Sequence, residues 1–251
     1  MSDELEKDDG WNALRKHTSA RVGIGRAGNS IPVKQSLAFK LAHAHARDAV
    51  YSKLDSEQLT ASLAQFNLPV LKIESQADYR ELYLQRPDLG RFPDEASVQQ
   101  LQIHTGQSDV AIIIADGLSA YAVNSNAVAM LEILLPMLVS AKLTIAPIVL
   151  VEHGRVAIGD AVASILNAKL SLVLIGERPG LSSSDSMGAY LTYNPQPGLT
   201  DEARNCVSNI RPEGLPHNEA ARKLYYLIQQ AFRRKISGVT LKDDTEQGYF
   251  P

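Results

Sequence analysis

The second half of the chain alternates short apolar runs with amphipathic segments. VAIIIADG at 110–117 is apolar up to an Asp-Gly pair, and LTIAPIVLV at 143–151 and LSLVLIG at 170–176 have the same character. Such runs are typical of buried parallel strands, since helices cover both faces of a parallel sheet. Helical patterns separate these runs at 123–140 and 156–168. The alternation predicts an α/β fold with a doubly wound, mainly parallel sheet.

The flanking segments add further elements to this prediction. Residues 33–54 place alanine and leucine at helical spacing and predict a helix, on which His43 and His45 point to different faces and cannot share a metal. The remaining expected elements are a helix at 56–66, a short strand VLKIES, a turn-rich connector YLQRPDLGRF, a strand AYLTYN and a last helix at 218–234.

A G-x-G-x-x-G spacing occurs in RVGIGRAGNSIP, at Gly23, Gly25 and Gly28. This spacing binds a dinucleotide pyrophosphate when a buried strand precedes it and a helix begins at its last glycine. The residues before Gly23 are too polar for a buried strand, and Pro32 disfavours helical geometry at residue 31. A glycine-rich turn, followed by a helix with Pro32 at or near its first position, is the favoured interpretation.

The composition is that of an ordinary globular protein, with 45% apolar and 21% charged residues among 251. A net charge of −3 gives no long-range attraction for nucleic acid. The longest apolar runs are about half of the roughly 20 residues that span a membrane, and the acidic N-terminus lacks the apolar region of a signal peptide. The single cysteine, Cys206, excludes an internal disulfide. We expect a soluble cytoplasmic protein whose first ten residues are mobile or bound to a partner.

Candidate chemistry lies in loops, because ligands of an open parallel sheet bind beyond the carboxyl ends of its strands. This rule points to ADGLS, EHGRV, GERPG and NCVSNIRPEG, at 115–119, 152–156, 176–180 and 205–214. No histidine is evidently placed to act as a base for Cys206 or for the serines at 182–184, and the histidines are too scattered for zinc. The residues alone therefore predict a ligand-binding α/β protein with no catalytic set and no metal site.

Short motifs through most of the chain carry a resemblance to one family. Over residues 14–241 the chain resembles the small (light) subunit of ethanolamine ammonia-lyase, through the ordered motifs RVGIGRAG, LAHAHARDAV, YLQRPDLGR, DGLSA, HGRVAIGD, LIGERPGL, CVSNIRPEG and KISGVTL. The resemblance implies an N-terminal tail and helical region at 1–105 that contacts a large subunit in a hetero-oligomer. It also implies a Rossmann-like cobalamin-binding domain at 106–251, and it places RVGIGRAG as a turn against the large subunit.

The resemblance further implies a function. In this family the large subunit binds ethanolamine, and radical chemistry from adenosylcobalamin converts it into acetaldehyde and ammonia, while the small subunit helps to bind the cofactor. Val156, Glu177 and Cys206 match the positions that contact cobalamin, and they fall in three of the loops chosen above. Glu177 would face the corrin amides or the ribose of the nucleotide tail, or else would pair with Arg178 or Arg155 and only brace its loop.

The sequence also bears on the axial ligand of cobalt, on rival functions and on localisation. His153 lacks the neighbouring aspartate and glycine of the D-x-H-x-x-G motif, so cobalamin is expected to keep its own dimethylbenzimidazole on cobalt. A rival interpretation is an NAD-dependent oxidoreductase with Asp48 on the ribose, although Asp48 lies inside a predicted helix, and another is a structural partner that never touches the cofactor. The short N-terminus leaves residence in a bacterial microcompartment in doubt.

Overall fold

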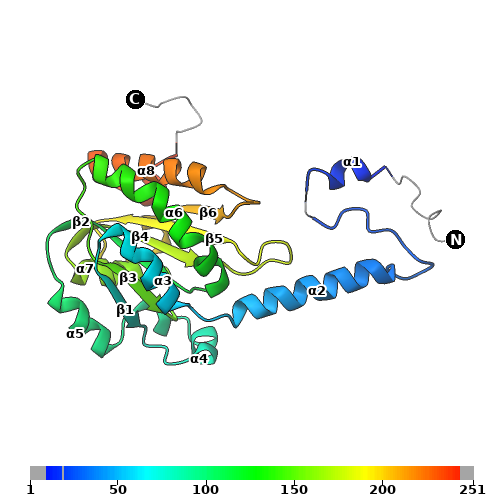
Figure 1. The fold of residues 1–251 in the computed structure, drawn as a ribbon, viewed down its shortest axis with the longest axis horizontal. Coiled ribbons are helices and arrows are strands. Elements are labelled where there is room, and N and C mark those ends of the chain that lie inside the picture. Colours follow the sequence, from blue (N-terminus) through cyan, green and yellow to red (C-terminus); the bar gives the residue numbers. More distant parts are fainter. Residues whose placement is uncertain (1–9, 19, 244–251) are drawn as a thin grey trace.

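A six-stranded sheet forms the centre of the computed structural model, which describes residues 10–18 and 20–243 (Figure 1). The strand order is β1-β3-β2-β4-β5-β6. β1, β3, β2 and β4 are parallel, whereas β5 is antiparallel to β4 and β6 is antiparallel to β5. The strands are β1 Val70–Glu74, β2 Ser108–Ala115, β3 Ile148–Glu152, β4 Ala168–Gly176, β5 Met187–Tyr193 and β6 Asn205–Ile210.

The predicted α/β class is confirmed, but the Rossmann-like, doubly wound arrangement is not, because the sheet is mixed. Residues 177–186 join β4 to β5, and residues 194–204 join β5 to β6, in both cases without an α-helix. A parallel pair needs a crossover of a dozen or more residues, usually a helix. These short connections therefore return the chain antiparallel. The segment NCVSNI, expected within a loop, is strand β6.

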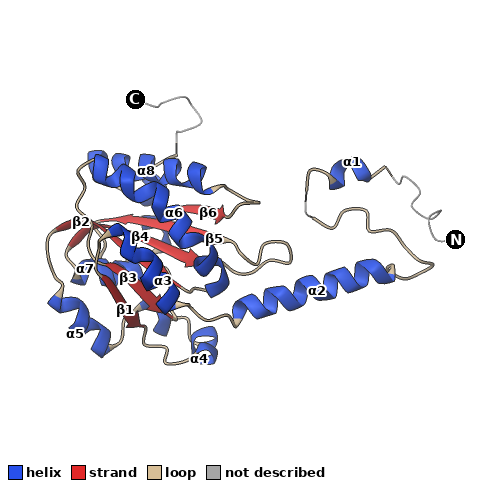
Figure 2. Cartoon of the chain, in the orientation of Figure 1, coloured by secondary structure: helices blue, strands red, loops and turns tan. Residues whose placement is uncertain are grey.

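Helices cover both faces of the sheet, as Figure 2 shows. One face packs against α3 (Ser56–Leu63), α6 (Ala120–Ser140) and α8 (His217–Arg234). The other face packs against α5 (Glu95–Ile103) and α7 (Ile158–Ile165). Within β2, residues 110–115 are fully buried and alternate between the two cores, which explains their continuous apolar pattern.

Most of the predicted helices and strands are confirmed. Residues 56–66 form α3 and a 3₁₀ turn (Ala64–Phe66), and Asp55 caps α3 by accepting the N–H of Gln58. The prediction missed α5 and most of α4 (Arg80–Gln85), because α4 is short and its end lies within the presumed connector.

Helix α6 is long and apolar enough, by length and composition, to cross a membrane. In the structure it is a core helix instead: half of its most apolar window is buried, and ten of its side chains are buried among the strands and α8. Its composition is therefore explained by packing inside the protein.

The N-terminal segment projects from the sheet and its helices (Figure 1). The predicted helix at 33–54 is α2 (Val33–Val50), with Pro32 as its N-cap, and a short helix α1 (Asn12–Arg15) precedes it. Ala49 is the one buried residue of α2, and apolar side chains stay exposed along the helix. The expectations for residues 1–9 lie outside the described residues.

The glycine motif forms a turn, as predicted. Gly23, Gly25 and Gly28 all have positive φ, and Ala27 and Ser30 exchange backbone hydrogen bonds across the turn. Left-handed backbone is accessible to glycine at little cost, so the turn explains the glycines without a nucleotide. No strand feeds this turn within the described residues, and the structural conditions for a dinucleotide site are not met.

Candidate functional site

The carboxyl ends of the four parallel strands meet at one edge of the sheet. From β2 the chain runs to α6 on one face, and from the neighbouring β3 it runs to α7 on the opposite face. Adjacent strands whose connections leave to opposite faces open a crevice, which is where ligands of open α/β sheets bind. The loops after β2 and β3, nominated from the sequence, lie at this point.

A buried carboxylate organises this crevice. Asp116 directly follows β2 and is 4% exposed. Its Oδ1 accepts the N–H of Gly154 at 3.1 Å, its carboxylate also accepts the N–H of His153, and its Oδ2 pairs with Nη1 of Arg80 at 3.3 Å. Burial raises the pKa of Asp116, and the charge of Arg80 opposes that shift. The β2 and β3 loops are therefore joined through one side chain.

Arg80 extends this network to two other segments. Its Nη1 donates to the carbonyl of Gly117 at 2.8 Å, and its Nε donates to the carbonyl of Val50, the last residue of α2, at 2.8 Å. The base of the projecting helix is thus fixed to the loop that follows β2. No local sequence pattern marks Arg80 for this role, since its partners are 30 or more positions away.

Tyr83, also on α4, lies between two guanidinium groups. The Arg80 guanidinium is 4.9 Å from the ring centroid and the Arg155 guanidinium is 4.1 Å from it. The Tyr83 hydroxyl donates to the carbonyl of Gly154 at 3.1 Å, and burial raises the pKa of Tyr83, so the hydroxyl remains a donor. Arg155 and Tyr83 therefore hold one another in place beside the crevice.

Beside this cluster is a cavity of about 410 Å³, called here the strand-end pocket. It is bounded by the loops after β2, β3 and β4 and by β5 and β6, whose Tyr190 and Ser208 are only partly covered. Two of the three predicted cofactor residues, Val156 and Glu177, line it. The full lining is Tyr83, Gly117, Leu118, Arg155, Val156, Ile175, Gly176, Glu177, Arg178, Tyr190 and Ser208.

Glu177 accepts three hydrogen bonds from the protein. The hydroxyls of Ser186 and Ser208 each donate to its carboxylate at 2.5 Å, and the N–H of Asn209 donates at 3.3 Å. Among the described residues, neither Arg178 nor Arg155 forms an ion pair with it. The loop is braced, but by serines and one backbone N–H instead of arginine.

Cys206, the third predicted residue, is on β6 opposite Tyr190 of β5. Its thiol is hydrogen-bonded to the Tyr190 side chain, which lines the strand-end pocket, although Cys206 itself is not among the lining residues. The residue is exposed, yet partial desolvation of the sulfur beside the sheet raises the pKa of the Cys206 thiol. A raised pKa disfavours the thiolate and with it a nucleophilic role.

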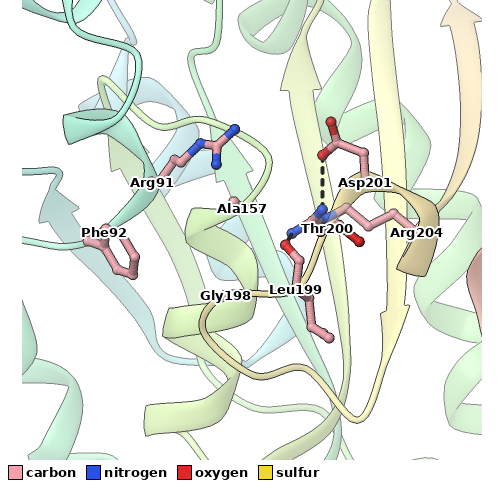
Figure 3. A pocket seen from close by; sticks show the side chains of 8 residues that line it. All are labelled: Arg91, Phe92, Ala157, Gly198, Leu199, Thr200, Asp201 and Arg204. Carbon is pink, nitrogen blue, oxygen red and sulfur yellow. Dashed lines mark hydrogen bonds and ion pairs between the residues drawn. The ribbon is translucent and has the colours of Figure 1, made fainter.

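A smaller cavity of about 240 Å³ lies beyond Val156, between residues 91–92 and the segment before β6. Figure 3 shows Arg91 and Phe92 on one side and the ion pair of Arg204 and Asp201 on the other. Arg204 is 3% exposed and also pairs with Asp160 of α7. Arg204 thus pairs with both Asp160 and Asp201, although Nε of Arg204 and Oδ1 of Asp160 have no hydrogen-bond partner among the described residues, and the ion pairs connect α7 to the segment before β6.

Two other hypotheses are tested by these positions. Asp48 lies on α2 and lines a cavity at the base of that helix, and no strand precedes it in the part of the chain that the structure describes. The NAD-dependent interpretation therefore lacks the ribose-binding strand end that it requires. Among the described residues, no group of three or more His, Cys, Asp or Glu side chains is arranged to hold a metal ion.

The chain is an α/β protein with a mixed six-stranded sheet and a pocket at the carboxyl ends of its parallel strands. A family model for the ethanolamine ammonia-lyase light chain (EutC) matches residues 8–242, and the chain belongs to this family. An ethanolamine ammonia-lyase small subunit of Xanthomonas campestris is 51% identical over 95% of this chain and 89% of its own length. Small subunits from Pseudomonas aeruginosa and Azotobacter vinelandii are each 49% identical, over 97% and 94% of this chain and 90% and 89% of their own lengths.

The buried pair of Asp116 and Arg80 gives a stability prediction. Arg80→Met leaves the carboxylate buried without its cation, so we expect a loss of about 3–5 kcal/mol in the free energy of unfolding. Asp116→Asn with Arg80→Met should lose less than the sum of the single changes, because the pair acts as a unit. Urea unfolding of the full chain measures both.

Arg86→Met is the matched control, because Arg86 pairs with Asp88 at the protein surface, where both side chains are 58% exposed. This variant should unfold like the unchanged protein. Equal effects of Arg80→Met and Arg86→Met would contradict a central role for the buried pair.

Proposed function

We propose that this chain forms one wall of an adenosylcobalamin site and joins a large subunit that converts ethanolamine into acetaldehyde and ammonia. The observation that carries the proposal is the convergence of Val156 and Glu177 on the strand-end pocket, with Cys206 one hydrogen bond away through Tyr190. Membership in the ethanolamine ammonia-lyase light-chain family supports it.

The chemistry of the pocket fits part of a cobalamin. A corrin has large apolar edges and amide side chains, which suit a wall that combines Leu118, Val156 and Ile175 with the polar groups of Glu177 and Ser208. Arg155 also lines the wall, and only Nη2 of its guanidinium donates a side-chain hydrogen bond within the described residues, so the wall has a donor to offer. About 410 Å³ cannot enclose a whole cobalamin. The remaining walls would come from the large subunit.

The residues of this chain hold the cofactor in this proposal, and the cofactor supplies the radical that starts the reaction when it is bound. His153 packs 6.0 Å from the Tyr83 ring, centroid to centroid, and is not a lining residue of the strand-end pocket. We therefore expect cobalamin to keep its own dimethylbenzimidazole. Burial keeps the Tyr190 hydroxyl protonated by raising its pKa, so that this side chain serves as a hydrogen-bond donor.

Helix α2 is the proposed contact for the large subunit. Val33, Leu37 and Leu41 are spaced four apart, share one side of the helix and are 74%, 59% and 58% exposed. An 18-residue helix with one buried residue gains little from its own protein. A partner that covers this apolar row would stabilise the helix by burying it.

Co-expression with a large subunit tests the function as a whole. Acetaldehyde should form from ethanolamine only when both subunits and adenosylcobalamin are present, since in this proposal the large subunit binds ethanolamine. Turnover by the isolated chain would contradict the division of roles. Failure of the assembled pair to need cobalamin would contradict the cofactor assignment.

Substitution of Glu177 tests the cofactor wall. A hydrogen bond to a charged group contributes about 1.5–3 kcal/mol, so Glu177→Ala should weaken cobalamin binding to the complex about ten- to hundredfold. The melting temperature should fall as well, because Ser186 and Ser208 lose their acceptor. Equilibrium dialysis of the folded complex measures affinity separately from stability.

Glu213→Gln is the matched control for that experiment, because Glu213 is 83% exposed and does not line the strand-end pocket. It should leave the cobalamin affinity unchanged. A Glu177→Ala complex with a lower melting temperature but unaltered affinity would show that the carboxylate only braces its loop.

The row on α2 gives a test of assembly. Leu37→Gln with Leu41→Gln should weaken association with the large subunit at least tenfold, because each leucine is expected to bury its side chain at the interface. The melting temperature of the isolated chain should not change, since both side chains are already exposed. His43→Gln with Arg47→Gln, which are also exposed and spaced four apart but lie on a different side of the helix, is the control. Equal effects of the two pairs in sedimentation titrations would contradict the proposed contact.

A further inference from the structure

Two arginines line the strand-end pocket without a carboxylate partner. Arg155 follows β3 and Arg178 follows β4, and in the part of the chain that the structure describes neither forms an ion pair. The acidic residue of the pocket, Glu177, is occupied by two serine hydroxyls and a backbone N–H. With two arginines and one glutamate, the lining keeps an excess of one positive charge.

Arg155 is held ready for a ligand. Its N–H donates to the carbonyl of Gly90 at 2.7 Å, its Nη2 donates to the carbonyl of Tyr83 at 3.1 Å, and its guanidinium stacks 4.1 Å from the centroid of the Tyr83 ring. Its Nε is buried and has no acceptor within the described protein. The Nη1 group of the same guanidinium has no hydrogen-bond partner among the described residues and is not buried, so it is the group that can reach an acceptor of a ligand in the pocket.

Arg178, unlike Arg155, is not held in place by the described part of the protein. It is exposed, and it follows Glu177 directly, so it lies beside a carboxylate that three donors hold in place. An exposed arginine can adjust to a ligand, whereas Arg155 is positioned before the ligand arrives. A planar guanidinium binds phosphate oxygens through paired, charge-assisted N–H bonds.

We propose that Arg155 and Arg178 bind the phosphodiester of the cobalamin nucleotide tail. This inference rests on the proposed function. The phosphodiester is the one anionic group of a cobalamin, whose corrin side chains are neutral amides, and the strand-end pocket is the place where unpaired arginines meet an apolar surface. Val156 and Ile175 on the same wall would contact apolar parts of the cofactor.

The test compares adenosylcobalamin with adenosylcobinamide, which lacks the nucleotide tail and its phosphodiester. Binding of each to the co-expressed complex is measured by equilibrium dialysis. Arg155→Met should weaken adenosylcobalamin binding about ten- to hundredfold and leave adenosylcobinamide binding unchanged. Arg178→Met should act in the same direction but more weakly, since the side chain is exposed. Arg155→Lys should restore part of the loss, because it keeps the charge without the planar fork.

Arg91→Met is the control, because Arg91 is exposed and lines the neighbouring cavity of about 240 Å³ instead of the strand-end pocket. It should change neither affinity. Unchanged adenosylcobinamide binding also shows that an Arg155→Met complex is folded.

Three outcomes would overturn the inference. Equal losses for the two ligands would make Arg155 a structural residue, and no loss for either would remove both arginines from the site. Equal affinity of the unchanged complex for the two ligands would mean that the tail is not bound here. A complex that binds neither ligand would instead contradict the proposed function itself, and the inference with it.

Discussion

The buried carboxylate of Asp116 is the constraint on which the rest of the site depends. A charge that is 4% exposed persists only when it is paired and hydrogen-bonded, and here Arg80, Gly154 and His153 supply those partners. His153 has a φ of 55°, a strained value for a residue with a side chain, and its N–H bond to Asp116 helps to hold it there. The turn that follows brings Arg155 and Val156 to the strand-end pocket.

The antiparallel strands β5 and β6 form the side of the strand-end pocket that the loops after β2 and β3 do not provide. Parallel strands are covered on both faces, whereas antiparallel strands can leave one face open. In this chain β5 and β6 extend the sheet past α7, and their side chains at Tyr190, Cys206 and Ser208 stay partly or fully uncovered on that side. A wholly parallel sheet would have needed crossover helices that cover this face. The antiparallel direction of these two strands, which was not predicted, therefore leaves this side of the strand-end pocket open.

Hydrophobic periodicity predicted the helices and strands that carry a regular apolar pattern in the sequence. The buried β2 and β4 and the helices α2, α3, α6, α7 and α8 were predicted in place, because each has a continuous apolar run or a helical repeat. β6 was missed, since Cys206 and Ser208 face an uncovered side and leave its pattern polar. The antiparallel direction of β5 and β6 was not predicted. It depends on whether a helix connects two strands, and the apolar pattern of the strands themselves does not show this.

The site was predictable only in part. Val156 and Glu177 were proposed as cofactor residues because strand ends and a family resemblance point to the same loops; both line the strand-end pocket, and their contact with a cofactor stays a prediction. Arg80 and Tyr83 were not found, because α4 is a short helix whose importance comes from partners distant in sequence. Arg155 lay in a nominated loop, but its unpaired Nε is visible only once the neighbours are placed.

Arg80 connects helix α2, the proposed contact for the large subunit, with the strand-end pocket. Arg80 donates to the last carbonyl of α2, to Asp116 and to the carbonyl of Gly117, and Gly117 lines the strand-end pocket. The Tyr83 ring contacts the same guanidinium and also the guanidinium of Arg155. A partner bound to α2 would therefore contact a helix whose last carbonyl is joined, through Arg80, to residues that border the pocket. Assembly with a large subunit and completion of the cofactor wall would then be linked through this column of side chains, even though α2 itself projects away from the sheet.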